Sequence, residues 1–478
     1  MKQLFKYAKT STLTACFLTC LTLTSCVGGT STADAGEKAS RMIKTTTPER
    51  PAGQTDVVQL AVDPIPVVRV GFIGLGMRGP GAVHRMTNIP GVEVVALCDV
   101  EKDRVEKVNK RLTDAGFPKA KEFYGDTAAW RQLTAMPDID LIYVATPWDS
   151  HAKIGKQAMF DGKHVAIEVP AAMSMEEIWD LINTSEQTRK HCMQLENCVY
   201  DFFELTTLNM AQQGVFGEVL HAEGAYIHNL EPFWNDYWNN WRLEYNINNL
   251  GDVYPTHGIG PACQLLDMHR GDKMNYLVSM QTKTVCIPEY IKKSTGKDVS
   301  ENFQNGDHTL TLIKTEKGKT MNIQHNVATP RPYNRMYQLT GTKGFANKYP
   351  VSGYALTELA DGVASKNHEA LDGHSFVSED LKKELMAKYK HPIVDDQLEA
   401  TAKKVGGHGG MDYIMDYRLI HCLQNGLPLD MDVYDLAEWC CLVPLTAVSI
   451  ANESAPVEIP DFTRGAWDRV KGYRHATK

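Results

Sequence analysis

The sequence predicts a doubly wound α/β domain built on a parallel sheet, followed by an α+β domain with an open, mainly antiparallel sheet. Between residues 67 and 195, short apolar runs such as VVRVGFIG, VEVVALCD and DLIYVATP alternate with helix-like stretches such as EKDRVEKVNKRL. Apolar strands separated by helices indicate a parallel sheet covered on both faces. From residue 196 to 478 the β-like runs are longer, as in GEVLHAEGAYIH, with few helices between them, so an antiparallel sheet is expected. The tail from Asp412 to Asn452 is predicted to be helical.

The first 66 residues are predicted to lie outside both domains. Lys2 and Lys6 precede an apolar, Thr-rich run that ends in the letters LTSC, which is typical of a secretory signal over residues 1–26. The small residue directly before Cys26 resembles the lipobox of bacterial lipoproteins, in which this cysteine carries the lipid. The alternative is a signal peptide with an incidental cysteine. Residues 27–66, rich in Gly, Ser, Thr and Pro, are expected to form a flexible tether, and the chain is predicted to be an exported lipoprotein anchored at the periplasmic or cell-surface face of a membrane.

Charge and cysteine usage argue against two classes of protein. The formal net charge is −8 and the chain has no dense run of Lys or Arg, so no nucleic-acid partner is predicted. The cysteines that follow the signal show no C-x-x-C and no regular spacing, so neither a disulfide framework nor a metal site is expected. Cys98, Cys263, Cys440 and Cys441 are interpreted as small core residues.

A glycine-rich turn follows the first strand directly. Gly74, Gly76 and Gly79 form G-x-G-x-x-G after VVRVGFIG and open a helical stretch, an arrangement that lets a dinucleotide diphosphate approach the backbone at a helix N-terminus. The next strand ends at Asp99, whose carboxylate accepts ribose hydroxyls and repels a 2′-phosphate, and the next two residues include no arginine. The sequence therefore predicts a Rossmann domain with NAD as its cofactor, the alternative being a Rossmann fold without one.

Two later strand ends are expected to border the same crevice, because ligands lie beyond the carboxyl ends of parallel strands. The first is ATPWDSH, which runs from Ala145 to His151. The second is Glu168 with Val169.

These motifs resemble the Gfo/Idh/MocA oxidoreductases, which have an N-terminal Rossmann domain and a C-terminal open-faced sheet. Those proteins usually carry an E-K-P motif with a catalytic lysine, whereas this chain reads Glu168-Val169-Pro170. Valine transfers no proton, so ordinary alcohol dehydrogenation by that lysine is put in doubt. The sequence is more similar to glycoside hydrolase family 109, which includes NAD-dependent α-N-acetylgalactosaminidases. The shared pieces span nearly the whole chain after the signal and include GLGMRG, TPWDSH, EVP, ENCVY, YPTHGIGP and PDFTRGAW.

The resemblance implies two sets of site residues. Those implied to contact NAD are Met77, Arg78, Asp99, Trp148, Asp149, Ser150, His151, Glu168, Val169, Asn197 and Tyr254. Those implied to line the sugar site are Tyr226, Arg242, Tyr254, Pro255, Thr256, His257 and Tyr333. The aromatic segment NLEPFWNDYWNNWR looks shorter than the family's usual form, which could alter the sugar or aglycone that fits.

The same resemblance implies a redox-neutral glycosidase. Oxidation of the sugar C3 hydroxyl acidifies the C2 proton, C1 loses its substituent by elimination, water adds, and the hydride returns. An exported enzyme has no large NAD pool to reoxidise its cofactor, which favours this cycle. The alternatives are an NAD-dependent sugar dehydrogenase of the Gfo/Idh/MocA type and a non-catalytic sugar-binding lipoprotein. The expected partners are a small-molecule or glycan substrate and the membrane, and a homo-oligomer is one alternative for the assembly.

Such a cycle needs proton-transfer groups. Tyr254 and His257 stand three residues apart with Pro255 between them at a helix start, so both can face one crevice. We predict that His257 transfers protons, with Tyr254 as its partner or as a nicotinamide contact; the alternative for His257 is a helix cap or a backbone contact. Tyr226 and His228 are expected on alternating faces of a strand, so that only one of them faces the site.

Two further polar residues stand out. Arg242 is a candidate for holding a hydroxyl, an N-acetyl oxygen or a carboxylate, with a surface ion pair as the alternative. His408 lies between four glycines in GGHGG. Because glycine-rich loops are often connectors, His408 is not assigned to the site.

Overall fold

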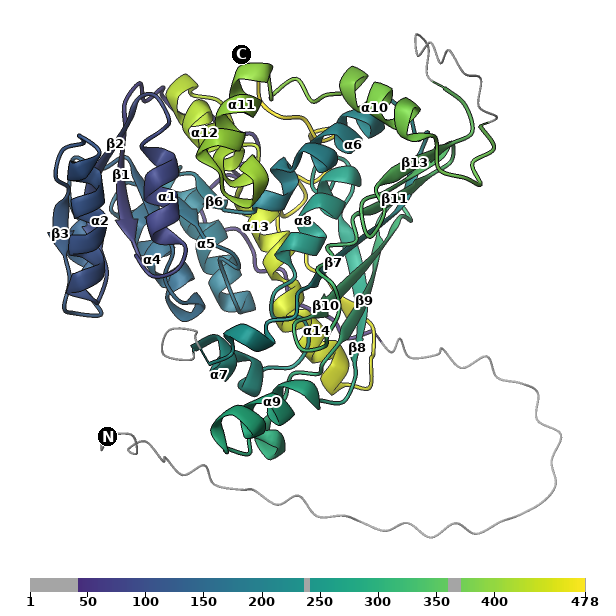
Figure 1. The fold of residues 1–478 in the computed structure, drawn as a ribbon, viewed down its shortest axis with the longest axis horizontal. Coiled ribbons are helices and arrows are strands. Elements are labelled where there is room, and N and C mark those ends of the chain that lie inside the picture. Colours follow the sequence, from purple (N-terminus) through teal and green to yellow (C-terminus); the bar gives the residue numbers. More distant parts are fainter. Residues whose placement is uncertain (1–41, 236–240, 360–370, 478) are drawn as a thin grey trace. The chain divides into compact units, whose positions relative to one another are not determined.

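The computed structural model describes residues 42–235, 241–359 and 371–477. The predicted signal peptide, Cys26 and the first part of the predicted tether lie outside these residues. Two sheets are each flanked by helices, and the C-terminal helices α12 (Met411–Asn425) and α13 (Val433–Cys440) lie between them (Figure 1).

The first sheet is parallel throughout, with the strand order β3-β2-β1-β4-β5-β6. This confirms the predicted doubly wound domain. Strands β4 and β5 are buried along their whole length, which explains why their sequences are apolar without alternation. The strands are β1 (Val68–Ile73), β2 (Val92–Cys98), β3 (Lys121–Phe123), β4 (Leu141–Val144), β5 (His164–Ile167) and β6 (Cys192–Gln194). The helices are α1 (Gly79–Met86), α2 (Lys102–Asp114), α3 (Trp130–Thr134), α4 (Trp148–Phe160) and α5 (Met175–Thr188).

The second sheet has the strand order β13-β12-β11-β7-β10-β9-β8-β14, and only β7 and β10 pair in parallel. It is therefore mainly antiparallel, as predicted. Helices α8 (Thr256–Leu265) and α14 (Leu442–Ala451) pack on β7 and β8, whereas outward side chains such as Leu312 stay exposed. The strands are β7 (Val219–Ile227), β8 (Met274–Gln281), β9 (Thr309–Thr315), β10 (Thr320–Asn326), β11 (Gln338–Gly341), β12 (Gly344–Asn347), β13 (Gly353–Leu356) and β14 (Val457–Glu458).

The second domain contains more helix than the sequence indicated, so the expectation of few helices between its strands is wrong. Helix α8 shows the reason. Nearly all of its residues are buried, so THGIGPACQL has no polar face and no helical period to detect. The predicted helical tail is confirmed by α12, α13 and α14. The other helices of this domain are α6 (Phe202–Gln212), α7 (Trp241–Asn248), α9 (Cys286–Thr295), α10 (Glu379–Lys388) and α11 (Asp396–Val405).

The C-terminal helices are core elements. By length and composition alone, the run Val433–Ala451 could cross a membrane. However, 78% of it is buried inside the fold. Cys440 and Cys441 lie in this run and are buried, as are Cys98 and Cys263. The interpretation of these four cysteines as core residues is confirmed.

The predicted flexible tether is wrong for residues 42–66. The guanidinium of Arg50 pairs with the buried carboxylate of Glu186 at 3.0 Å. Val57 is 2% exposed and belongs to the main apolar core. The ion pair and the buried apolar side chains offset the entropy that this segment loses when it is ordered, and its Gly, Pro and Thr content alone did not reveal them.

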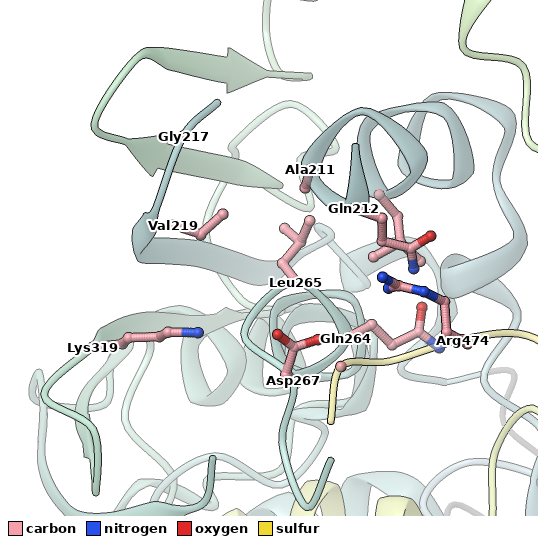
Figure 2. A pocket seen from close by; sticks show the side chains of 11 residues that line it. Ala211, Gln212, Gly217, Val219, Gln264, Leu265, Asp267, Lys319 and Arg474 are labelled. Carbon is pink, nitrogen blue, oxygen red and sulfur yellow. The ribbon is translucent and has the colours of Figure 1, made fainter. Parts of the chain in front are cut away.

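The two ends of helix α8 have different surroundings. A cavity of about 210 Å³ lies at its C-terminal end, next to α6 and β7 (Figure 2). Two polar side chains of this cavity are tied into the protein, because Gln264 donates to Tyr473 Oη and Asp267 accepts the Tyr473 N–H. The histidine singled out in the sequence lies at the other end of α8, where the candidate site is built.

Candidate active site

The turn between β1 and α1 leaves room for a diphosphate because glycines form it. Gly74 has a φ of +94°, and a Cβ there would lie 2.4 Å from Ala145 O. A Cβ on Gly79 would lie 2.0 Å from Gly74 O, so this position admits no side chain. A Cβ on Gly76 would meet only Arg104 Nη1, at 3.6 Å. The turn therefore fits the predicted dinucleotide, with the N-terminus of α1 toward the diphosphate.

Asp99 follows β2 and is held in place by the backbone. Its Oδ2 accepts the Leu75 N–H at 2.7 Å, and its Oδ1 accepts the Glu101 N–H at 2.9 Å. Arg104 Nη1 lies 3.5 Å from Asp99 Oδ1. The sequence interpretation missed this arginine because it lies beyond the strand end, on the first turn of α2. Asp99 is thus placed to accept the adenine ribose hydroxyls, and its charge offsets that of Arg104.

We expect the Asp99→Ser variant to reverse the cofactor preference. Without the carboxylate, nothing at this position repels a 2′-phosphate, and Arg104 on the first turn of α2 offers a guanidinium to bind it. The affinity for NAD should fall and that for NADP should rise, each about tenfold or about 1.4 kcal/mol. Calorimetric titration with both cofactors measures this. Asp103→Ser, which removes an exposed acid on α2 beside Arg104, is the matched control. An unchanged ratio of the two Kd values would contradict the assignment.

The predicted cofactor residues of ATPWDSH have different surroundings. Trp148 opens α4 and is buried, and Asp149 beside it is exposed. Ser150 Oγ donates within its own turn, at 2.8 Å. His151 is buried, with its ring nitrogens 2.7 and 2.8 Å from two backbone carbonyl oxygens. Ser150 and His151 therefore brace the loop, whereas Trp148 borders the crevice.

Arg78 and Glu168 connect the glycine turn with the end of β5. Arg78 Nε donates to Glu168 Oε1 at 3.2 Å. The Glu168 carboxylate raises the pKa of Arg78, so the guanidinium stays charged beside the diphosphate position. Met77, the preceding residue, is 71% exposed and free to cover a bound cofactor.

Val169 belongs to a small apolar cluster, separate from the main core, that joins the two domains. We call it the interdomain cluster. Val169 is buried within it, and its side chain offers no proton-transfer group. The buried members of the cluster are Trp148, Val169, Tyr226, Leu230, Trp234, Leu243, Tyr254, Ile287, Ile291, Phe303, Val327 and Ala328.

His257 lies at the centre of a hydrogen-bonded chain. Its Nδ1 lies 2.7 Å from Glu196 Oε1, and its Nε2 lies 3.3 Å from Tyr254 Oη. Burial alone would raise the pKa of Glu196, but His257 and the Cys198 N–H outweigh burial and hold this pKa below its ordinary value. Burial keeps the pKa of Tyr254 well above its ordinary value. The ionised Glu196 therefore orients the imidazole, whose Nε2 can exchange a proton with Tyr254 or with a substrate.

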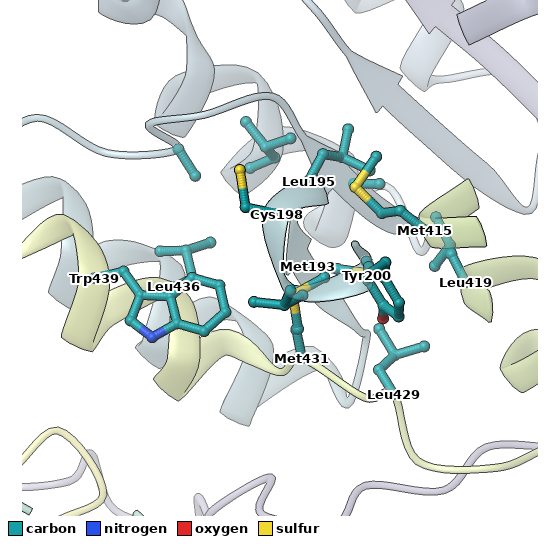
Figure 3. Packing of buried hydrophobic residues seen from close by; sticks show 14 of the residues in the cluster. Met193, Leu195, Cys198, Tyr200, Met415, Leu419, Leu429, Met431, Leu436 and Trp439 are labelled. Atoms are coloured by element: carbon teal, nitrogen blue, oxygen red, sulfur yellow. The ribbon is translucent and has the colours of Figure 1, made fainter. Parts of the chain in front are cut away.

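Glu196 and Asn197 are carried by a segment anchored in the core. Leu195, Cys198 and Tyr200 are buried, and Figure 3 shows them packed with side chains of α12 and α13. The sequence interpretation missed Glu196. Its one signal was its place beside Asn197, directly after β6, at the carboxyl edge of the parallel sheet.

Glu196, Cys198 and His257 bring three potential metal-ligand atoms within 4.8 Å of one another. A thiol binds metals as the thiolate. Burial raises the pKa of Cys198 well above its ordinary value, so the thiol stays protonated. Glu196 and His257 are also hydrogen-bonded to each other within this set.

Tyr226 and His228 face the same side of the chain at the end of β7, so the prediction that only one of them faces the site is wrong. Tyr226 Oη lies 2.9 Å from His228 Nδ1. Residues two apart on a strand share a face, and only direct neighbours alternate. Tyr333 packs edge-on against the His228 ring at 5.2 Å, and the Tyr226 ring lies 5.4 Å from that of His257. The structure thus brings these predicted sugar residues together.

Arg242 reaches the same place from α7. Its guanidinium lies 4.6 Å from the centre of the Tyr254 ring and 5.1 Å from that of Trp148. This stacking places a positive charge where the cofactor crevice meets the predicted sugar site. Pro255 and Thr256 are buried at the start of α8. Part of the aromatic segment before Arg242, residues 236–240, lies outside the described residues.

The close approach of α8 to β7 depends on two glycines. A Cβ on Gly224 would lie 2.0 Å from Gly258 O, and a Cβ on Gly258 would lie 2.7 Å from Ala225 N. Tyr226 follows Gly224 by two residues, and His257 directly precedes Gly258. Contact between the two backbones is therefore what brings both side chains to one site.

We expect Gly224→Ala to separate Tyr226 from His257. The added methyl group must push α8 away from β7, which should lower the free energy of unfolding on the order of 1–3 kcal/mol. We also expect kcat to fall about tenfold, equivalent to about 1.4 kcal/mol in the activation barrier. Thermal unfolding and steady-state kinetics check both effects. Glu223→Ala, on the opposite face of the same strand, is the control, and equal behaviour of the two variants would contradict this account.

A second imidazole, that of His408, lies beside the site. His408 Nδ1 lies 3.0 Å from Asp412 Oδ2, and Asn197 Nδ2 donates to the other oxygen of that carboxylate. Arg78 Nη2 donates to Asp412 as well, at 3.3 Å. Burial and nearby cationic groups, His408 among them, lower the pKa of His228. His408 therefore contacts residues of the candidate site, although the sequence analysis did not assign it there. The signal in the sequence was a histidine between four glycines.

Both domains match known families. The description "Glycosyl hydrolase 109, C-terminal domain" matches residues 200–469, and "Oxidoreductase family, NAD-binding Rossmann fold" matches residues 68–195. Glycosyl hydrolase family 109 protein 1 of Bacteroides thetaiotaomicron is 67% identical over 91% of this chain and 93% of its own length. The family 109 protein of Porphyromonas gingivalis is 65% identical over 91% of this chain and 92% of its own length.

Solved structures show the same fold at low sequence identity. Levoglucosan dehydrogenase in complex with NADH and L-sorbose is similar with a TM-score of 0.61, at 18% identity over 83% of this chain and 100% of its own. The scyllo-inositol dehydrogenase of Lactobacillus casei with bound NAD(H) and scyllo-inositol has a TM-score of 0.56, at 15% identity over 82% of this chain and 99% of its own. These likenesses concern the fold alone.

Proposed function

The chain belongs to glycosyl hydrolase family 109 and has an NAD-binding Rossmann domain, and we propose that it hydrolyses α-N-acetylgalactosaminides, or a related glycoside, by a redox-neutral cycle. One observation carries the proposal. The proton-transfer set of Glu196, His257 and Tyr254 lies beside the half of the Rossmann crevice that receives nicotinamide, at the ends of β4 and β5. Val169 stands where related oxidoreductases usually carry a lysine.

Different residues have different roles in such a cycle. NAD supplies, when bound, a hydride acceptor that is restored within the same turnover. His257 takes the proton of the sugar C3 hydroxyl, directly or through Tyr254, because Glu196 engages Nδ1 and leaves Nε2 to accept it. With C3 as a ketone, the C2 proton is acidic, C1 loses its substituent and water adds there. Tyr226, bonded to His228, and His408 are further groups able to accept the C2 proton or to protonate the leaving oxygen.

The test follows two signals at once. Purified residues 27–478 are incubated with NAD and p-nitrophenyl α-N-acetylgalactosaminide, and nitrophenol and NADH are recorded together. Release over many turnovers without net NADH is the expected result. NADH that accumulates with a free sugar, without nitrophenol release, would overturn the proposal in favour of a sugar dehydrogenase. Silence in both channels, with a panel of other glycosides also inert, would favour a non-catalytic sugar binder.

We also propose that Cys26 carries a lipid and that the chain is exported and membrane-anchored. The support is the sequence alone: N-terminal lysines, an apolar run and the letters LTSC. Metabolic labelling with a radioactive fatty acid tests this proposal in the native bacterium. Label should be incorporated by the natural chain and lost in Cys26→Ala; label retained by the variant would contradict lipidation at this residue.

A further inference from the structure

We propose that α7 is a clamp that retains the cofactor, in which Trp241 and Tyr245 hold Trp148 in place over the nicotinamide half of the crevice. The inference rests on the proposed function, in which one NAD serves many turnovers and slow release of the cofactor is required. It concerns residues that neither the G-x-G-x-x-G turn nor the proton-transfer set includes.

Trp148 is surrounded by aromatic rings from the substrate domain. The Trp241 and Tyr245 rings meet it edge-on, at centroid distances of 4.9 and 5.2 Å and angles of 76° and 84°. Tyr254 stacks on it at 5.7 Å. Trp148 itself is 3% exposed. Its indole therefore cannot rotate out of the crevice without breaking contacts with α7, since edge-to-face and stacked pairs are the favoured geometries of aromatic rings.

The contact between α7 and Trp148 is part of the interdomain cluster. Trp148 and Val169 come from the Rossmann domain, whereas Leu243 comes from α7 itself. Trp241 and Tyr245 pack against the same cluster. Figure 1 shows α7 on the side of the second domain that faces the Rossmann helices. Because the cluster is separate from the main core, we expect α7 to move away from Trp148 while both domains stay folded.

The contact between α7 and Trp148 can retain the cofactor because of where Trp148 lies. Trp148 is the first residue of α4, directly beyond the carboxyl end of β4, and in a doubly wound sheet this half of the crevice receives the nicotinamide nucleotide. Arg242, between the two clamp residues in sequence, lies over both Trp148 and Tyr254. Cofactor release therefore requires α7 to move.

The test measures release of NAD in the absence of any sugar. The purified chain is loaded with NAD labelled in the nicotinamide ring and chased with excess unlabelled NAD, and bound label is followed over time. We expect Trp241→Ala and Tyr245→Leu each to release label about tenfold faster than the natural protein, equivalent to about 1.4 kcal/mol. Leucine favours helix, so Tyr245→Leu keeps α7 intact. Trp241→Phe keeps an aromatic edge and should lie between the two extremes.

Phe233→Ala is the matched control, because Phe233 precedes α7 in the same region and its side chain is about half exposed. It should release label at the natural rate. Natural release rates in both Trp241→Ala and Tyr245→Leu would overturn the clamp, as would equal acceleration in Phe233→Ala. Because no substrate is present, this result is independent of whether nitrophenol is released in the glycosidase assay, so failure of the clamp and failure of the proposed function are distinguishable.

Discussion

The His257→Ala variant is expected to lower kcat about 10²–10⁴-fold, the range of a lost general acid or base, and to leave the binding of NAD unchanged. His257 Nε2 lies 3.3 Å from Tyr254 Oη, and Nδ1 is engaged by Glu196. The imidazole lies in the substrate domain, away from the glycine turn that holds the diphosphate. The loss should therefore appear in kcat and not in the Kd of NAD.

A matched control comes from another histidine. His221 lies on β7, half-buried, with its Nδ1 2.8 Å from Thr320 Oγ1. It stands an odd number of residues from Tyr226, so its side chain points to the opposite face of the sheet. His221→Ala should behave like the natural protein. If His257→Ala kept more than about a tenth of kcat, a deficit under the roughly 1.4 kcal/mol that one decade represents, its role in proton transfer would be contradicted.

Gly79→Ala is expected to weaken cofactor binding strongly. Its Cβ would lie 2.0 Å from Gly74 O, so the turn must open and the N-terminus of α1 must move away from the diphosphate. We expect the Kd of NAD to rise about hundredfold or more, equivalent to about 2.7 kcal/mol. Glycosidase activity should disappear with it at ordinary NAD concentrations and return in part at high NAD.

Gly81→Ala tests whether the effect is specific. Gly81 lies on the same helix, two residues further, and a Cβ there would meet only Arg85 Nη1 at 3.5 Å, an ordinary contact. Since alanine favours helix over glycine, this variant should bind NAD normally and be stabilised by up to about 1 kcal/mol. Calorimetry and thermal unfolding separate the two variants, and equal NAD affinity in both would refute the diphosphate position.

Local signals predicted the parts of the site that one segment builds. The glycine turn, Asp99 and the pair of Tyr254 and His257 each depend on a short stretch whose spacing sets the geometry. For Tyr226 and His228, the error was to place residues two apart on a strand on opposite faces. The choice of Tyr226 as a site residue did not depend on that error.

Contacts that site residues make with residues of distant helices and strands could not be predicted from local sequence signals. Glu196 reaches His257 from the end of β6, 61 positions away in the chain, and Asp412 reaches Arg78 from α12. Residues 42–66 are ordered by distant contacts that their Gly- and Pro-rich composition does not encode. Each of these contacts is a product of tertiary packing.

The central claim is that the glycosidic bond breaks through loss of the C2 proton and not by direct displacement at C1. Hydrolysis in D₂O tests it most directly, with the product sugar isolated and its C2 position examined by NMR and mass spectrometry. The account predicts one deuterium at C2 of the product, because the proton removed there is replaced from solvent. A product that keeps its original hydrogen at C2 after complete hydrolysis would contradict the elimination route and the role assigned to NAD.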